Sequence, residues 1–97
     1  RNDNLYVNEI APRVHNSGHL TINAYNVSQF ENHVRAVCKL EQIPLKKISN
    51  AMMINIIGDQ ITNYRNKEHS ENEFFFDYLK KEIKQKRKMG HLTTLLK

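Results

Sequence analysis

The chain has 97 residues, of which 39% are hydrophobic and 26% charged, and this is enough for one small domain with a modest core. Its net charge of +5 lies within Lys80–Lys88, which holds six basic residues and one acidic residue, so the excess indicates a local site for phosphate or another anion. A single cysteine, Cys38, excludes an internal disulfide, and no apolar run is long enough for a membrane span, so we expect the cytoplasm and no membrane partner.

The first half of the chain is predicted to contain one strand, one extended segment and one main helix. Leu5–Ala11 is predicted to be a strand, and Pro12 closes it by removing a backbone donor. Alternating apolar residues in His19–Ala24 suggest a second extended segment. Ser28–Glu31 has the pattern of a capping box, which predicts a helix from Ser28 to about Leu40. The apolar stripe of this helix consists of Phe30, Val34, Val37 and Cys38, and Glu31 can pair with Arg35.

The second half is predicted to be rich in β-structure. The nearly continuous apolar run Ala51–Ile57 predicts a buried strand, and the polar stretch Tyr64–Asn72 a loop. The aromatic run Phe74–Tyr78 and the segment Arg87–Leu95 are predicted to be two strands of a hairpin, with the basic run as their turn. The predicted class is therefore α+β, with an antiparallel sheet and one main helix.

Reactive residue types are concentrated in Asn8–His19, which contains a carboxylate, a guanidinium, two imidazoles, two carboxamides, a hydroxyl and a glycine. A polar loop that follows a strand is a common place for reactive groups. The Glu9 carboxylate is a hard oxygen ligand of the kind that Mg²⁺ prefers. Arg13 can donate paired hydrogen bonds to an anion, and His15 can orient an anion or transfer a proton near neutral pH. On residue types alone, an ordinary surface loop is the favoured interpretation of these residues.

The order of these residues resembles a known family. The segment Asn8–His19 (NEIAPRVHNSGH) is similar to the signature of 5-(carboxyamino)imidazole ribonucleotide synthase, the ATP-dependent subunit of phosphoribosylaminoimidazole carboxylase and a member of the ATP-grasp superfamily. Three more blocks follow in the family's order and at about its spacing: Ser28–Glu31, Met53–Gly58 and Arg87–His91. The first block is highly specific, the last moderately so, and the two in between would mean little alone.

The resemblance implies the C-terminal part of a longer enzyme. Residues 1–41 would be the end of an ATP-grasp domain, with the active-site loop and helix, and residues 42–97 a small antiparallel β-rich domain with the basic hairpin. The implied reaction, in de novo purine biosynthesis, converts ATP, 5-aminoimidazole ribonucleotide and bicarbonate to 5-(carboxyamino)imidazole ribonucleotide, ADP and phosphate. ATP and Mg²⁺ would be the cofactors. The parent protein is expected to be a homodimer, and these 97 residues alone are expected to be inactive.

The resemblance also implies a role for individual residues. Asn8 and Glu9 would contact ATP, with Glu9 as a magnesium ligand whose partner glutamate lies upstream. Arg13 and His15 would handle bicarbonate and carboxyphosphate as the catalytic pair. Asn16 could hydrogen-bond to the substrate or hold the loop.

The same resemblance places the ribonucleotide phosphate at the basic run, on Lys80 and Arg87. Two departures from the family pattern occur there. Leu79 replaces the glycine of Tyr-Gly-Lys, and Gln85-Lys86 replaces the Pro-Gly that precedes the arginine. These departures leave the turn geometry open and keep Lys81 as an alternative to Lys80.

Other interpretations of the same residues have less support. His15 and His19 have a zinc-compatible spacing, but Asn-Ser-Gly between them disfavours the helix that this spacing requires. The basic run with Phe74–Phe76 could form a non-catalytic anion- or nucleic-acid-binding surface, or simply a solvated surface, and we expect no nucleic-acid partner. Cys38 is interpreted as a core residue, because no activating base is evident.

Overall fold

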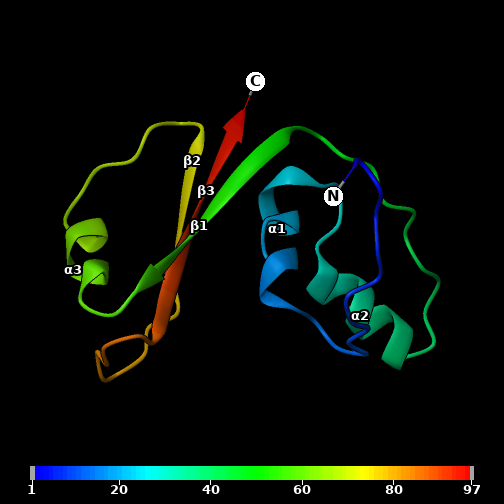
Figure 1. Cartoon of the computed structure of the whole chain (residues 1–97), viewed down its shortest axis with the longest axis horizontal. Coiled ribbons are helices and arrows are strands. Elements are labelled where there is room, and N and C mark those ends of the chain that lie inside the picture. Colours follow the sequence, from blue (N-terminus) through cyan, green and yellow to red (C-terminus); the bar gives the residue numbers. More distant parts are fainter. Residues whose placement is uncertain (1, 97) are drawn as a thin grey trace.

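The computed structural model describes residues 2–96 and confirms the predicted α+β class. A three-stranded antiparallel sheet with the order β1-β3-β2 lies between α3 on one face and α1 on the other (Figure 1). In chain order the elements are the 3₁₀-helix η1 (Asn16–Gly18), α1 (Thr21–Ala24), α2 (Gln29–Val37), β1 (Asn50–Ile57), α3 (Gln60–Arg65), β2 (Glu73–Asp77) and β3 (Lys88–Leu96). Among residues 2–96, no helix is long and apolar enough to cross a membrane.

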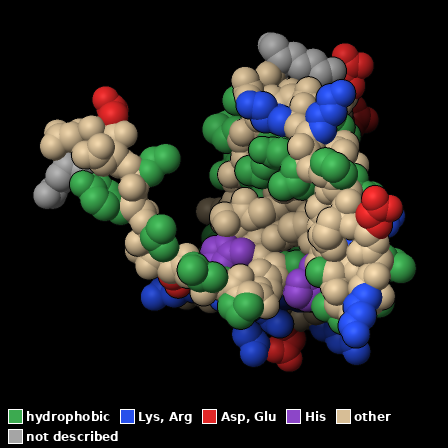
Figure 2. Space-filling view, turned by 90° about the vertical axis from the view of Figure 1, so that its right-hand side faces the viewer, with side chains coloured by type: hydrophobic (Ala, Val, Ile, Leu, Met, Phe, Trp, Pro, Cys, Tyr) green, Lys and Arg blue, Asp and Glu red, His purple; other side chains and the backbone are tan. Residues whose placement is uncertain are grey.

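The predicted strand Leu5–Ala11 is not formed. No strand is assigned there, and Leu5, Val7 and Ile10 are more than four-fifths exposed. The hydrophobic side chains on the arm that projects from the body in Figure 2 are correspondingly uncovered. The prediction was wrong for this chain because a strand needs a neighbour for its backbone N–H and C=O groups, and no described segment pairs with this one.

The predicted extended segment His19–Ala24 is also wrong, because the chain is helical there. The Thr21 hydroxyl donates to the carbonyl of Gly18 at 2.6 Å, and the Ala24 N–H donates to the Leu20 carbonyl at 2.9 Å. Ala24 is buried, and α1 packs against β3. A five-residue alternation is too short to distinguish a strand from a single helical turn that tertiary contacts stabilise.

The main helix α2 begins as predicted and ends earlier. The Ser28 hydroxyl accepts from the N–H of Glu31 at 3.1 Å, while the Glu31 carboxylate pairs with Arg35 at 3.0 Å. Lys39 adopts a left-handed conformation, with φ 58°, and the N–H of Leu40 donates to the Arg35 carbonyl. This is a Schellman ending, and it stops the helix at Val37 rather than Leu40.

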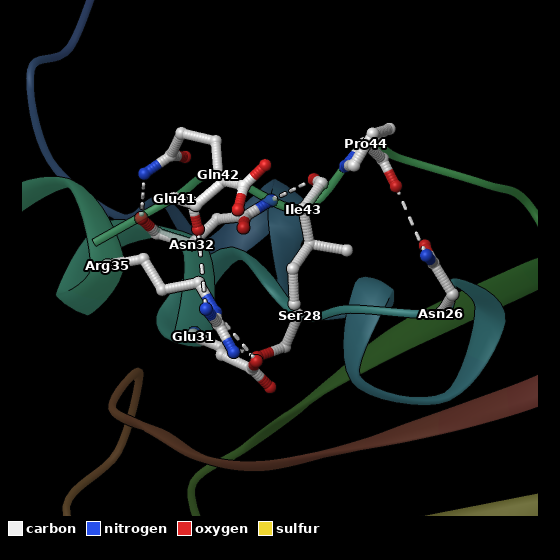
Figure 3. Close-up of polar contacts among 9 residues, drawn as sticks. All are labelled: Asn26, Ser28, Glu31, Asn32, Arg35, Glu41, Gln42, Ile43 and Pro44. Atoms are coloured by element: carbon white, nitrogen blue, oxygen red, sulfur yellow. Dashed lines mark hydrogen bonds and ion pairs between the residues drawn. The ribbon is translucent and has the colours of Figure 1, made fainter.

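Side chains of the α2 region hold the linker that leads to the sheet (Figure 3). Asn26 donates to the Pro44 carbonyl and accepts from the N–H of Lys46. Asn32 donates to the Ile43 carbonyl, and Gln42 donates back to the Asn32 carbonyl. The linker therefore follows a defined path from α2 to β1, although it contains no helix and no named strand.

The burial predicted for β1 is found on β3 instead. Met52 and Ile54 of β1 are about half exposed, whereas Met89–Thr93 of β3 are all buried. The reason is topological, since β1 is an edge strand and β3 lies between its two neighbours. A one-residue irregularity in the pairing, between Ile56 and Ile57, accompanies the burial of Met89.

The hydrophobic core lies between the sheet and α3. It consists of Ile56, Ile61, Met89 and Leu92, with Tyr64 and Phe75 packed against it. The β2–β3 hairpin forms as predicted, with the basic run as its connection. The opposite face of the sheet carries Phe76 and His91 in register and faces the polar N-terminal half of the chain.

Candidate active site

The segment Asn8–His19 has no regular structure until η1, and His15 caps that short helix. Nδ1 of His15 accepts from the N–H of Ser17 at 3.2 Å and lies 2.8 Å from the Ser17 hydroxyl. An imidazole nitrogen that accepts from a backbone N–H carries no proton, so the proton of neutral His15 is on Nε2. Nε2 lies 4.0 Å from a carboxylate oxygen of Glu9. Local backbone geometry thus aims the protonated nitrogen of His15 at Glu9.

Glu9 and His15 line one cavity, together with Ala11 and Ser17. Its volume is about 260 Å³. Its groups are a carboxylate, an imidazole and a hydroxyl, which suit an ion or a small polar ligand. Asn8 lies next to it in the chain and is exposed, while Asn16 belongs to η1, where its carbonyl accepts from the N–H of His19 at 3.1 Å. Of the predicted ATP and substrate residues in this segment, only Glu9 lines this cavity with His15.

Arg13 lines a different cavity, of about 280 Å³, which opens beside α2. The other lining residues are Val14, Thr21, Gln29, Asn32, His33 and Leu45. The guanidinium donates only to the neighbouring Val14 carbonyl, at 3.1 Å, and no carboxylate in residues 2–96 forms an ion pair with it. The structure therefore does not place the predicted pair Arg13 and His15 in one cavity. A guanidinium without a carboxylate partner can donate paired hydrogen bonds to an anion.

The basic connection between β2 and β3 lies at the lower end of the sheet in Figure 1, and Lys and Arg side chains gather at the lower edge of Figure 2. Nζ of Lys80 donates to the Lys88 carbonyl at 2.6 Å and lies 5.6 Å from the ring centre of Tyr78. The Arg87 guanidinium donates to the Glu82 carbonyl at 3.4 Å. Among the described residues, neither cation is neutralised by a carboxylate.

The two departures from the family's glycine pattern occur at left-handed positions. Leu79 has φ 56° and Lys86 has φ 69°. This region favours glycine, and an L-residue there costs about 1–2 kcal/mol. The connection therefore adopts a backbone conformation for which glycine would be suited, although neither residue is glycine.

Sequence reasoning missed a cluster of aromatic rings that joins the two halves of the chain. The ring of His19 lies 5.5 Å from that of His91 and 6.1 Å from that of Tyr78. The Tyr78 hydroxyl and Nδ1 of His91 are 2.8 Å apart, and Phe76 stacks on His91. The one feature of the sequence that pointed to this cluster is that His19 and His91 each end a block of the family motif. Their contact could not be predicted, because it depends on the tertiary fold.

Both histidines of this cluster favour the neutral form. Burial lowers the pKa of His19, and repulsion from Lys88 and His15 lowers it further. Burial also lowers the pKa of His91, with a contribution from His19. Burial raises the pKa of Tyr78, so its hydroxyl keeps its proton at neutral pH.

A loss of stability in mild acid follows from these shifts. Below pH 6.5 the unfolded chain protonates both histidines, whereas the folded chain keeps them neutral, so the free energy of unfolding falls as pH falls from 6.5. Buried His91 alone contributes a slope of up to about 1.4 kcal/mol per pH unit. Urea unfolding between pH 8 and pH 5 measures this slope. His91→Phe should reduce the slope of the free energy of unfolding against pH. His33→Phe is the matched control, because His33 is an exposed residue of α2. Equal slopes in the two variants would contradict the prediction.

The alternative interpretations gain no specific support from the geometry. Within residues 2–96, no three His, Cys, Asp or Glu side chains are grouped as metal ligands would be, and His15 and His19 flank a 3₁₀-turn. Phe75 packs against the core and Phe76 stacks on His91. Cys38 is exposed at the end of α2, so its interpretation as a core residue was wrong for this chain.

Family models match most of the chain. Residues 1–30 match the ATP-grasp domain, and residues 51–97 match the phosphoribosylaminoimidazole carboxylase C-terminal domain. The N5-carboxyaminoimidazole ribonucleotide synthase of Bacillus subtilis (strain 168) is 44% identical over 90 residues, which are 92% of this chain and 24% of the relative. The enzyme of the same name from Staphylococcus aureus (strain COL) is 42% identical over 97% of this chain and 26% of its own length.

Solved structures give the same result. A crystal structure of N5-carboxyaminoimidazole synthetase from Staphylococcus aureus has a TM-score of 0.86 and 41% identity, and the match covers 98% of this chain and 26% of that one. A synthase from Aspergillus clavatus, in complex with ADP and 5-aminoimidazole ribonucleotide, has a TM-score of 0.77 and 36% identity over 87% of this chain and 24% of that one. The chain thus spans about a quarter of the length of the curated relatives that it matches.

Proposed function

Because the chain belongs to the N5-carboxyaminoimidazole ribonucleotide synthase family, we propose that it acts as the C-terminal part of an ATP-dependent carbon–nitrogen ligase of the ATP-grasp type. The proposed reaction carboxylates the amine of 5-aminoimidazole ribonucleotide with bicarbonate, and ATP is converted to ADP and phosphate. Transfer of a phosphoryl group from ATP to bicarbonate would form carboxyphosphate, which releases CO₂ beside the amine. Such chemistry depends mainly on positioning and charge neutralisation, so no covalent nucleophile is required.

One observation supports this proposal beyond the similarity itself. Four arginines lie in the described part of the chain. Arg35 and Arg65 each pair with a carboxylate, whereas the side chains of Arg13 and Arg87 donate only to backbone carbonyls. An unneutralised guanidinium keeps its charge for a bound anion. These are the two arginines that the family resemblance assigns to ligands, Arg13 to bicarbonate and carboxyphosphate and Arg87 to the ribonucleotide phosphate.

The Arg13–His15 segment would handle the carboxylated anion. Arg13 would bind carboxyphosphate through paired hydrogen bonds and neutralise its charge. His15 would donate its Nε2 proton in a hydrogen bond to bicarbonate, since Nδ1 accepts from the N–H of Ser17. Asn16 follows directly and would contact the substrate or stabilise the turn. In the described structure Arg13 and His15 line separate cavities, so the ligand would have to lie between them.

Asn8 and Glu9 would serve the nucleotide, with Glu9 as a Mg²⁺ ligand. The exposed Glu9 carboxylate fits a hard cation, and the ion would neutralise the phosphates of ATP. Since no group of three candidate ligands occurs in residues 2–96, the other ligands would come from ATP and from the remainder of the ATP-grasp chain.

ADP release by the full-length protein tests the proposed reaction. Release should require both 5-aminoimidazole ribonucleotide and bicarbonate, and omission of either should reduce it to background. The 97-residue chain alone should release no ADP, because it lacks the rest of the nucleotide site. ADP release that ignores both substrates would refute the proposed reaction, although ATP binding could remain.

Lys80 is proposed to bind the ribonucleotide phosphate together with Arg87. In the full-length protein, Lys80→Gln should raise the KM for the ribonucleotide about 10-fold or more, as expected for the loss of one charge-assisted hydrogen bond, with little change in the KM for ATP. Lys81→Gln is the matched comparison, because Lys81 is exposed and its side chain has no hydrogen bond or ion pair to any residue from 2 to 96. A larger effect from Lys81→Gln would assign the role to Lys81 instead.

Several broader features remain part of the proposal. We divide the chain at residues 41 and 42, so that the active-site loop and α2 belong to the ATP-grasp domain and the sheet to the smaller domain. The full-length protein is proposed to be a homodimer, on the family resemblance. A cytoplasmic location is proposed because the only cysteine is unpaired, which suits a reducing compartment.

A further inference from the structure

Gln29, the first residue of α2, is hydrogen-bonded to two histidines of the active-site segment, His15 and His19. Its Oε1 accepts from the N–H of His15 at 2.9 Å, and its Nε2 donates to the carbonyl of His15 at 2.7 Å. The same Nε2 lies 2.9 Å from Nδ1 of His19. One carboxamide thus holds both backbone groups of His15 and the ring of His19.

The orientation of this carboxamide follows from its partners. A backbone N–H can only donate, so the atom opposite the His15 N–H must be Oε1, and the other carboxamide atom must be the NH₂ group. This NH₂ group donates one hydrogen to the His15 carbonyl and the other to Nδ1 of His19. Nδ1 of His19 therefore has to accept, and the proton of His19 is on Nε2.

The surroundings of Gln29 hold it rigidly. Its N–H donates to the Thr21 hydroxyl at 2.9 Å, and the preceding residue, Ser28, caps α2. A Cβ added to Gly18 would lie 2.8 Å from Cδ of Gln29, so the carboxamide fits against a position that has no side chain. Helix, cap and glycine together leave the carboxamide little freedom.

We propose that Gln29 is a positioning residue of the carboxylating site, which holds the His15 backbone in place and fixes His19 as the neutral Nε2–H tautomer. The inference rests on the proposed function, since His15 is there the residue that meets bicarbonate. Gln29 acts through His15 and His19, and we propose no contact between Gln29 and the reacting atoms. Its role is to hold the backbone of the segment around His15 at a fixed position relative to α2.

The tautomer of His19 matters because of what surrounds its ring. His15 and Lys88 are close enough to lower its pKa by repulsion, and His91 and Tyr78 face it from the sheet. Phe30 covers it from α2 at 5.3 Å. A positive charge on His19 would lose hydration in this partly buried place and would be repelled by Lys88. A neutral His19 therefore adds no positive charge between Lys88 and the active-site segment.

Gln29→Glu in the full-length protein is the decisive variant. The carboxylate can still accept from the His15 N–H, but it cannot donate to the His15 carbonyl or to Nδ1 of His19. A carboxylate beside Nδ1 also favours a protonated ring. Gln29→Met removes all three hydrogen bonds and adds no charge. Gln42→Glu is the matched control, because Gln42 is exposed in the linker, and its side chain makes a single 3.4 Å hydrogen bond, to the backbone carbonyl of Asn32.

Two measurements are needed, ring ¹⁵N spectra of histidine-labelled protein and steady-state ADP release. We expect the unmodified protein to show the Nε2–H form of His19 at neutral pH, and Gln29→Glu to show the imidazolium. We expect kcat to fall about 10- to 100-fold in both Gln29 variants, as for a misplaced catalytic group, with an unchanged KM for ATP. The Glu variant should also shift the pH profile of kcat, whereas the Met variant should not, and Gln42→Glu should match the unmodified protein.

An unchanged His19 spectrum and an unchanged kcat in Gln29→Glu would overturn the inference. A fall in kcat that Gln42→Glu reproduces would also overturn it, because the effect would then be one of general stability. ADP release that is independent of substrate in the unmodified protein would overturn only the proposed reaction. In that case the His19 spectrum of Gln29→Glu still decides whether Gln29 fixes the tautomer.

Discussion

Arg13→Ala in the full-length protein is expected to lower substrate-dependent ADP release by about 100- to 1000-fold in kcat, the size of effect seen when a preorganised charge-stabilising donor is removed. The structural reason is that the Arg13 guanidinium bonds only to the adjacent Val14 carbonyl and borders a cavity of about 280 Å³. Removing it deletes a positive charge that no described carboxylate neutralises. The folded structure should hardly change, because the side chain is exposed.

Two further arginine variants make this result specific. Arg13→Lys keeps the charge but loses the planar pair of donors, so its kcat should lie between that of the Ala variant and that of the unmodified protein. Arg35→Ala removes an arginine that pairs with Glu31 on α2, so it tests for a general effect of lost charge. A near-normal rate in Arg13→Ala, or an equal loss in Arg35→Ala, would remove Arg13 from the mechanism.

Gly90→Ala is expected to destabilise the folded chain by about 3 kcal/mol, at the upper end of the usual range for overpacking. A Cβ at Gly90 would lie 2.5 Å from the carbonyl oxygen of Phe76 and 3.1 Å from Cδ1 of Ile61. The first contact is with backbone on the paired strand β2, so relief requires the two strands to separate. The measurement is the urea dependence of unfolding by circular dichroism.

The double variant Gly90→Ala with Ile61→Val identifies the cause. Ile61→Val removes the Cδ1 atom and should itself cost about 1 kcal/mol. If the backbone contact dominates, the double variant is no more stable than Gly90→Ala. Recovery of stability in the double variant would mean that the Ile61 side chain, rather than the strand spacing, makes the glycine necessary.

The elements that were predicted correctly are those with a local cause. The start of α2 follows from the Ser28 cap, and the Glu31–Arg35 pair from the helical period. The β2–β3 hairpin follows from an aromatic strand and a charged turn that cannot be buried. The cap and the ion pair depend on residues three or four positions apart, and the hairpin joins two strands that follow one another in the chain, so sequence spacing is sufficient to predict them.

The elements that were predicted wrongly depend on a partner elsewhere. Leu5–Ala11 has the composition of a strand, but no described strand lies beside it. His19–Ala24 alternates as a strand would, yet packing of Ala24 and the hydroxyl of Thr21 make it helical. The end of α2 depends on the left-handed conformation of Lys39, which could not be predicted because glycine, not lysine, is typical of such positions.

The family, the α+β class and the residues of the motif could be predicted before the structure was known, because the order of residue types along the chain does not depend on its conformation. Which of these residues contact one another depends on the three-dimensional fold. It placed His15 with Glu9, Arg13 in a separate cavity, and His19 against His91 across 72 positions of sequence. It also revealed Gln29, whose three hydrogen bonds join residues 10 and 14 positions away. Contacts of this kind depend on burial and on the pairing of distant strands, which no local pattern encodes.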